Sequence, residues 1–175
     1  MELLYVLEGL RTPVGDAFFS LITHLGEETL FIVAGLLVFW CIGKWEGYYL
    51  LSVGLTGTVI NQFLKLWFRI PRPWVKDPNF TIVESARAEA TGYSFPSGHS
   101  TSSVGTFGVI ATESKRLWVK LLAAAMCFLI PLTRLYLGVH TPADVLVGSA
   151  ISLLFIVVLR PVIYLDDGRH IPKLL

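Results

Sequence analysis

Apolar segments, each close to the length that crosses a lipid bilayer, constrain this chain more than any other feature. They fall at about 29–43, 47–67, 98–112, 117–137 and 143–165. A helix of ~20 residues crosses the ~30 Å hydrocarbon core, and the first and third segments are short for this task. Because lipid offers the backbone no hydrogen-bond partner, we expect these segments to be helices.

Composition agrees with a membrane location. Of 175 residues only 15% are charged, whereas soluble domains contain ~25%. A net charge of +1 also makes a nucleic-acid partner unexpected. We therefore predict an all-α, polytopic membrane helix bundle with five clear spans, formed by residues 1–175 as a single integral-membrane domain.

Residues 1–28 form a different kind of segment. The apolar positions that recur there at helical spacing are Val14, Ala17, Phe18, Leu21, Ile22 and Leu25. Asp16, Ser20 and His24 fall off this stripe. The pattern is typical of an amphipathic helix in the membrane interface, and a sixth spanning helix is the alternative.

Counting membrane crossings places three polar regions on one face. The loop at 68–97 joins the second and third segments, and the connection at 134–142 follows two further crossings. The start of the first segment, near Glu27 and Glu28, lies on the same face whichever way the N-terminus runs. These glutamates either stabilise the helix dipole or take part in a site.

The first polar stretch, KLWFRIPRP, holds Lys65 and Arg72 seven positions apart. About two helical turns separate them, so both side chains can point the same way if the helix persists. Pro71 and Pro73 are expected to end that helix. A cation at the mouth of a span either has a function or extends to water, and the spacing leaves both interpretations open.

The second stretch, FPSGHSTSS, contains a candidate anion site. Ser97 is a candidate N-cap, and the free backbone N–H groups of the helix that follows can bind an anion. His99 stands in the first turn of this helix, beside the expected anion. A capped helix with a polar first turn is the alternative interpretation.

The third stretch, TRLYLGVHTPAD, pairs His140 with Asp144. Thr141, Pro142 and Asp144 fit the N-cap, N1 and N3 positions of a helix, so Asp144 can complete a capping arrangement. Asp144 can equally accept a hydrogen bond from one nitrogen of His140 and leave the other free to attack, and the two roles are compatible. Arg134 adds a guanidinium that suits phosphate oxygens.

Together these stretches resemble the type 2 phosphatidic acid phosphatase family, which shares its site with the vanadium haloperoxidases. The family signature is Lys-x6-Arg-Pro, then Pro-Ser-Gly-His, then Ser-Arg-x5-His-x3-Asp. The matching residues are Lys65, Arg72, Pro73, Pro96, Ser97, Gly98, His99, Arg134, His140 and Asp144. Thr133 replaces the usual serine and keeps its hydroxyl, while the first of the usual six spans is either missing or reduced to the amphipathic start.

The resemblance implies a metal-independent phosphoryl transfer without a cofactor. In this scheme His140 attacks phosphorus to form a phosphohistidine, Asp144 orients it, and His99 protonates the leaving oxygen. The groups implied to hold the phosphoryl oxygens are Lys65, Arg72, Ser97, Gly98 and Arg134. Phosphate-ester cleavage needs positioning and charge stabilisation above all, so three cations can supply what Mg²⁺ supplies elsewhere. No carboxylate cluster in the sequence indicates a metal site.

The resemblance also implies a lipid phosphate substrate whose tail stays in the membrane. The candidates are phosphatidic acid, phosphatidylglycerol phosphate and isoprenoid diphosphates such as undecaprenyl diphosphate. Vanadate-dependent halide oxidation and catalytically silent binding or transport of a lipid phosphate are the alternatives. The loop aromatics Trp74, Phe80, Tyr93 and Phe95 either lie in the interface or contact the lipid.

Charge bias predicts the orientation of the site. Seven basic residues fall on the face away from the motifs: Lys44, Lys115, Arg116, Lys120, Arg160, Arg169 and Lys173. The motif face has six, three of which are the motif cations Lys65, Arg72 and Arg134. The positive-inside rule then directs the site to the periplasmic or exterior side of the plasma or inner membrane.

Overall fold

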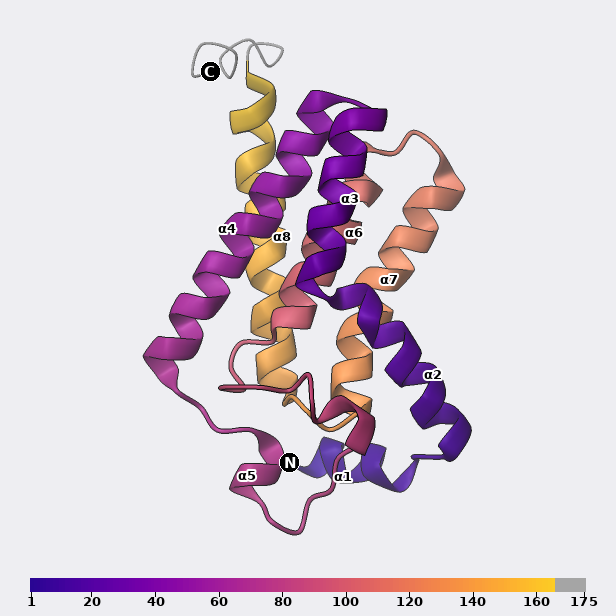
Figure 1. The fold of residues 1–175 in the computed structure, drawn as a ribbon, viewed down its shortest axis with the longest axis vertical. Helices are drawn as coiled ribbons and strands as arrows, with labels where there is room; N and C mark the ends of the chain where they lie inside the picture. The colour runs from indigo at the N-terminus through magenta and orange to yellow at the C-terminus, as the bar shows by residue number, and fades with distance from the viewer. Residues whose placement is uncertain (166–175) are drawn as a thin grey trace.

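A computed structural model describes residues 1–165 as helices joined by short connections and one long loop (Figure 1). In chain order the elements are α1 (Glu2–Gly9), α2 (Pro13–Thr23), the 3-10 turn η1 (His24–Gly26), α3 (Glu28–Cys41), α4 (Lys44–Phe68), α5 (Pro73–Lys76), the 3-10 turn η2 (Glu84–Ala86), α6 (Gly98–Glu113), α7 (Leu117–Tyr136) and α8 (Pro142–Tyr164). No strand occurs among the described residues, and the predicted all-α class is confirmed.

Helices α3, α4, α6, α7 and α8 occupy the five predicted apolar segments. By length and composition, α7 and α8 can each cross a membrane alone. Helix α3 joins the preceding segment, Pro13–Gly26, at a bend of 51°, and the bent pair makes a third candidate if it forms one broken span. The prediction of five clear spans is therefore not confirmed. Helix α3 has only 14 residues, and the polar first half of α6 lowers the apolarity of that helix.

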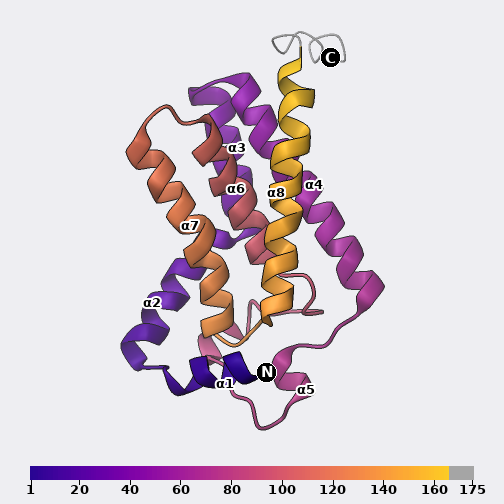
Figure 2. The same cartoon turned by 180° about the vertical axis from the view of Figure 1, so that it is seen from behind.

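Helix α6 lies at the centre of the bundle and packs against α3, α4, α7 and α8, while α4 and α8 also pack against each other (Figures 1 and 2). Its serine, threonine and glycine residues are small and let the neighbouring backbones approach closely. Hydrogen bonds then connect the helices: Asn61 of α4 donates to the Thr101 hydroxyl at 2.9 Å, and Ser152 of α8 donates to the Thr101 carbonyl at 2.5 Å. Polar side chains of α4, α6 and α8 thus lie in the interior of the bundle and join these helices.

Helix α2 turns its polar side toward the protein and its apolar stripe outward. Tyr136 of α7 donates a hydrogen bond to Asp16 at 3.0 Å, and the hydroxyls of Ser20 and Ser85 lie 2.7 Å apart. Val14 and Leu21 are 81% and 69% exposed. An outward apolar stripe suits contact with lipid, which both interpretations of the N-terminal segment require.

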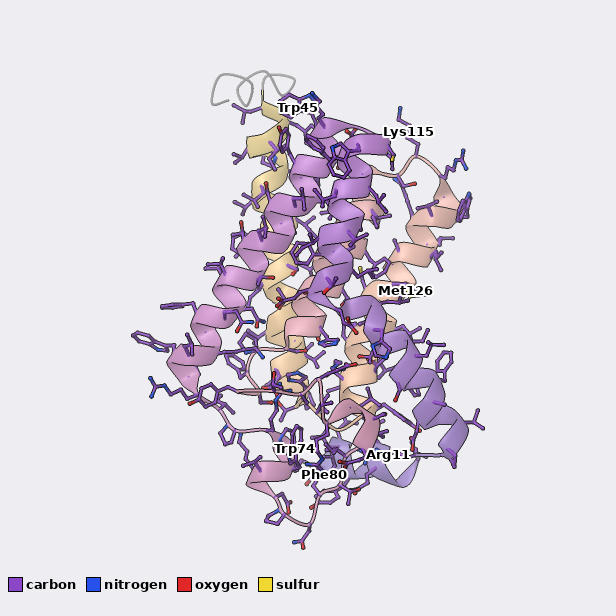
Figure 3. The ribbon with its side chains drawn as sticks, viewed as in Figure 1. Arg11, Trp45, Trp74, Phe80, Lys115 and Met126 are labelled. Carbon is purple, nitrogen blue, oxygen red and sulfur yellow. The ribbon has the colours of Figure 1, made fainter. Side chains whose placement is uncertain are left out.

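Helix α1 holds the long loop at one end of the bundle. Arg11 donates to the carbonyl oxygens of Thr81 and Tyr136 at 2.9 and 3.0 Å, and Tyr5 packs edge-on against Phe80. Figure 3 shows Arg11, Trp74 and Phe80 together at this end, with Trp45 and Lys115 at the other.

The ends of the bundle agree with the predicted separation of charge. The α3–α4 and α6–α7 connections and the C-terminal end of α8 lie opposite α1 and α5 (Figures 1 and 2), and they carry five of the seven counted basic residues. The other two, Arg169 and Lys173, lie outside the described residues.

Close packing of α3 on α4 at Gly54 predicts an effect on stability. A Cβ added at Gly54 would meet the Phe31 ring at 2.5 Å, and Phe31 is only 2% exposed. We expect Gly54→Ala to lower the free energy of unfolding by ~1–3 kcal/mol, seen as a lower thermal midpoint in detergent. Gly9→Ala is the control, because its Cβ meets no heavy atom within 4 Å. Equal midpoints for the two variants would contradict this packing.

Candidate active site

A pocket of about 570 Å³ lies where the start of α3, the last turns of α4, the long loop, the first turn of α6 and the end of α7 meet. The predicted site residues that line it are Lys65, Arg72, Gly98, His99, Arg134 and His140. The other two predicted residues, Ser97 and Asp144, lie behind this wall, 0% and 2% exposed. Three stretches that are distant in sequence therefore meet at one pocket.

His140 is held in one tautomer by its neighbours. Arg72 Nη1 lies 2.9 Å from His140 Nε2. A guanidinium only donates hydrogen bonds, so Nε2 must be the accepting, unprotonated nitrogen. The proton then sits on Nδ1, which faces Asp144 Oδ2 at 3.5 Å. Burial lowers the pKa of His140 well below its ordinary value, so the imidazole is neutral near pH 7.

Asp144 is held by hydrogen bonds from the long loop and from the start of α8. Its Oδ2 accepts a hydrogen bond from Ser94 Oγ at 2.5 Å and from the Thr141 backbone N–H at 2.8 Å. Thr141 Oγ1 in turn accepts from the Asp144 N–H at 3.3 Å, which completes the predicted capping box of α8. The Asp144 carboxylate can thus cap α8 and orient His140 at the same time.

Lys65 and Arg72 bind the long loop through its carbonyl oxygens. Lys65 Nζ donates to Tyr93 O at 3.1 Å, while Arg72 donates to Thr91 O at 2.8 Å and to Gly92 O at 3.2 Å. Burial lowers the pKa of Arg72 to about 10, which keeps the guanidinium charged near pH 7. The hydrogen bonds favour a function at the pocket over extension of the two cations into water.

Helix α6 begins at the pocket as the sequence predicted. Ser97 Oγ accepts from the Ser100 N–H at 3.3 Å and so caps the helix, while its own N–H donates to Asp144 O at 2.9 Å. Gly98 and His99 then follow on the pocket wall. Its start presents backbone N–H groups where an anion in the pocket can reach them.

Arg134 is the most enclosed cation of the site. It is 1% exposed, its Nη1 donates to Thr23 Oγ1 at 2.6 Å, and its Nε has no hydrogen-bond partner. Thr23 comes from α2, so the N-terminal segment takes part in building the site.

Several residues near the pocket were missed by sequence reasoning. Ser94 and Thr23 belong to no motif, and nothing in the sequence singles them out. Glu89, in the long loop, lies 3.6 Å from His99 Nε2 and 3.8 Å from Arg134 Nη1. The nearby His99 imidazole lowers the pKa of Glu89, so this carboxyl is ionised near pH 7.

Glu89 also belongs to a group of a type that can hold a metal ion. One ligand atom each from His24, Glu27 and Glu89 lies within 4.8 Å of the others. The sequence indicated no such cluster, because its members come from two segments that only the fold brings together. Carboxylate–imidazole ion pairs explain the same arrangement, with 2.6 Å between His24 Nδ1 and Glu27.

The loop aromatics have mixed surroundings. Phe80 is 3% exposed and lies under Arg11 and Tyr5 rather than in an interface. The guanidinium groups of Arg72 and Arg87 lie 5.9 and 5.8 Å from the centre of the Trp74 ring. Tyr93 lines the pocket, where contact with a ligand is possible.

Comparison with known proteins identifies the family to which the chain is similar. The family model described as PAP2 superfamily matches residues 45–166. A protein named phosphatidylglycerophosphatase B, from Bacillus subtilis strain 168, is 31% identical over 159 residues, which cover 83% of this chain and 73% of that protein.

Two solved structures share the fold. The crystal structure of Aquifex aeolicus LpxE has a TM-score of 0.79 at 26% identity, covering 90% of this chain and 92% of that one. A transmembrane PAP2 type phosphatidylglycerolphosphate phosphatase from Bacillus subtilis has a TM-score of 0.76 at 26% identity, covering 92% of this chain and 82% of that one.

Burial of His140 predicts its titration. A lowered pKa means that the ring stays neutral at a pH where an ordinary histidine, with a pKa near ~6.5, is half protonated. We expect the ring signals of His140, observed by NMR in isotope-labelled protein in detergent, to show no protonation as the pH falls from ~7.5 to ~6. His140→Gln assigns the signal. A titration midpoint at or above the ordinary value would contradict the buried, neutral imidazole.

Proposed function

The chain belongs to the PAP2 superfamily of phosphatases, and on this premise we propose that it hydrolyses a phosphate ester or diphosphate of a membrane lipid through a phosphohistidine at His140. One observation carries the proposal. The unprotonated Nε2 of His140 is held beside Arg72, at a pocket that Lys65, Arg134 and His99 also line. A neutral imidazole, fixed cations and a second histidine are the groups that in-line phosphoryl transfer needs.

In the first step, Nε2 of His140 attacks phosphorus and forms an N–P bond while the P–O bond to the lipid breaks. The proton on Nδ1 faces Asp144, whose negative charge stabilises the ring as it becomes cationic. Arg72 Nη1, which lies 2.9 Å from Nε2, has to release this nitrogen and turn to a phosphoryl oxygen. His99, in its protonated form, gives its proton to the leaving lipid oxygen.

In the second step, water replaces the lipid oxygen. His99, now neutral, takes a proton from this water as it attacks phosphorus, and the N–P bond breaks to release inorganic phosphate and neutral His140. The oxygens of the transferring group are bound throughout by Lys65, Arg72 and Arg134, with the backbone N–H of Gly98 and the start of α6 adding donors. Ser97 acts from behind the pocket wall, where it caps that helix.

The proposed reaction needs no metal ion. Three cations line the pocket and supply the charge that stabilises a phosphoryl group in transfer. The His24–Glu27–Glu89 group lies at the rim, and no step is assigned to it. Its presence makes a chelator an essential part of the test.

The substrate is a lipid, because the site opens at the ends of helices that suit a bilayer. A matched relative and a matched structure, both from Bacillus subtilis, are named for phosphatidylglycerol phosphate, which supports a lipid phosphate without fixing its head group. Helices α3, α4, α6, α7 and α8 cross the membrane, with α3 extended by the bent N-terminal segment. The pocket faces the periplasm or exterior, away from the basic end of the bundle.

Activity tests this proposal directly. Purified protein in mild detergent with EDTA is expected to release phosphate from phosphatidic acid or phosphatidylglycerol phosphate. His140→Ala should lower kcat/KM by roughly a thousand-fold or more, because the nucleophile is lost. Asp77→Asn is the control, because Asp77 is a loop carboxylate that lies outside the pocket, where it accepts a hydrogen bond from the Tyr5 hydroxyl. This variant should keep the wild-type activity.

Three results would contradict the proposal. One is phosphate release that requires an added metal ion, and another is release that survives in His140→Ala. The third is the absence of release from any lipid phosphate or diphosphate by folded protein. That result would favour a silent lipid-phosphate-binding protein, and bromide or iodide oxidation with added vanadate would instead favour a haloperoxidase.

A further inference from the structure

Three carboxylates share the pocket with the three cations. Glu27, Glu28 and Glu89 line it together with the guanidinium and ammonium groups of the site. A site for a phosphoryl group is ordinarily rich in positive charge, whereas here equal numbers of fixed charges of each sign line the walls. Neither the motifs nor the proposed reaction uses these acidic groups. We call Glu27, Glu28 and Glu89 the acidic rim.

Glu89 reaches closest to the reacting groups. Its Oε2 lies 3.6 Å from His99 Nε2 and 3.8 Å from Arg134 Nη1, and it is buried without a hydrogen-bond partner. Its Oε1 lies 3.1 Å from His24 Nδ1, and His24 contacts Glu27 at 2.6 Å. The long loop thus places a negative charge beside the proposed general acid, and His24 of the N-terminal segment contacts the same carboxylate.

Several buried polar atoms at the pocket have no hydrogen-bond partner among the described residues. Arg134 is 1% exposed and its Nε has no partner, and His99 Nε2 is likewise buried and unpaired. Buried donors rarely stay unsatisfied, so both are expected to bind a group that enters the pocket. One phosphoryl group offers enough oxygens to use these donors together with Lys65 and Arg72.

We propose that the acidic rim restricts the site to lipids that carry a single phosphoryl group, so that a phosphomonoester is hydrolysed in preference to a diphosphate. The inference rests on the proposed function. The phosphoryl group that reacts occupies the cations at His140. The second phosphoryl group of a diphosphate would have to lie farther out, among the carboxylates of the rim.

The physical reason is repulsion between like charges in a partly enclosed pocket. Charges at contact distance near a protein surface interact several times more strongly than in bulk water. The rim therefore disfavours a second phosphate more strongly than the first, since the cations compensate the first. The hydroxyl groups of a glycerol or sphingoid head group can instead donate hydrogen bonds to the rim carboxylates.

The test compares the monophosphate and the diphosphate of one isoprenoid alcohol, so that the tails are identical. Initial rates are followed by chromatography of the lipid products, because a diphosphate yields the monophosphate first. Wild type is expected to show kcat/KM for the monophosphate about ten-fold or more above that for the diphosphate. Glu28→Gln and Glu89→Gln should each lower this ratio by about three-fold or more, and the double variant further.

Glu84→Gln is the matched control. Glu84 lies in the same loop and pairs with Arg87 at 2.6 Å, outside the pocket, so its removal should leave the ratio unchanged. The ratio is the deciding quantity, because a purely structural or general loss of activity changes both substrates alike. Glu28 is exposed at the start of α3, so its replacement keeps the test valid if Glu89→Gln folds poorly.

The outcomes separate the two proposals. If both substrates are hydrolysed and the ratio is the same in the rim variants as in wild type, the inference about the rim is wrong and the proposed function stands. A wild-type preference for the diphosphate overturns the inference in the same way. If folded protein releases phosphate from neither substrate nor from any other lipid phosphate, the proposed function fails and the inference fails with it.

Discussion

The buried carboxylate of Asp144 is the group on which the rest of the site depends. It accepts hydrogen bonds from the loop through Ser94 and from the first turn of α8 through Thr141, and it faces the Nδ1 of His140. The Asp144 carboxylate therefore caps a membrane helix, anchors the loop that forms the pocket wall and faces the protonated nitrogen of the proposed nucleophile, whose tautomer is set by Arg72. Burying this carboxylate is costly unless every partner is in place, which ties the geometry of the pocket to the packing of the bundle.

The cations are placed by the same principle. Arg134, Arg72 and Lys65 lie at helix ends, and their hydrogen bonds reach a hydroxyl of α2 and carbonyl oxygens of the loop. These contacts hold them at the pocket before a phosphate arrives, so little reorganisation remains for the reaction itself. Two of these cations are expected to form new hydrogen bonds when the phosphoryl group binds. Arg134 Nε has no hydrogen-bond partner, and Arg72 is hydrogen-bonded to the nitrogen that has to attack.

The positions of the helices and the meeting of the motifs could be predicted from the sequence, because a segment that crosses a membrane can only be a helix here and each crossing reverses the side. The five apolar segments became helices close to the predicted ends, and crossing parity correctly brought His99, His140 and Lys65 to one pocket. Whether each helix spans is less certain from sequence, since α3 is short and α6 carries polar residues for packing. Glu89 could not be found in advance, because its loop has no periodic pattern and only tertiary contacts with His99 and Arg134 give it a position. Ser94 was missed for the same reason.

The central claim is that His140 carries the phosphoryl group during turnover. The most direct measurement is to mix the protein with a ³²P-labelled lipid phosphate, quench within milliseconds in alkali, where phosphohistidine is stable, and map the label by mass spectrometry. The account predicts a label on the peptide that contains residue 140, lost on acid treatment and absent in His140→Ala. Rapid turnover with no labelled protein at any time, or with the label on another residue, would contradict it.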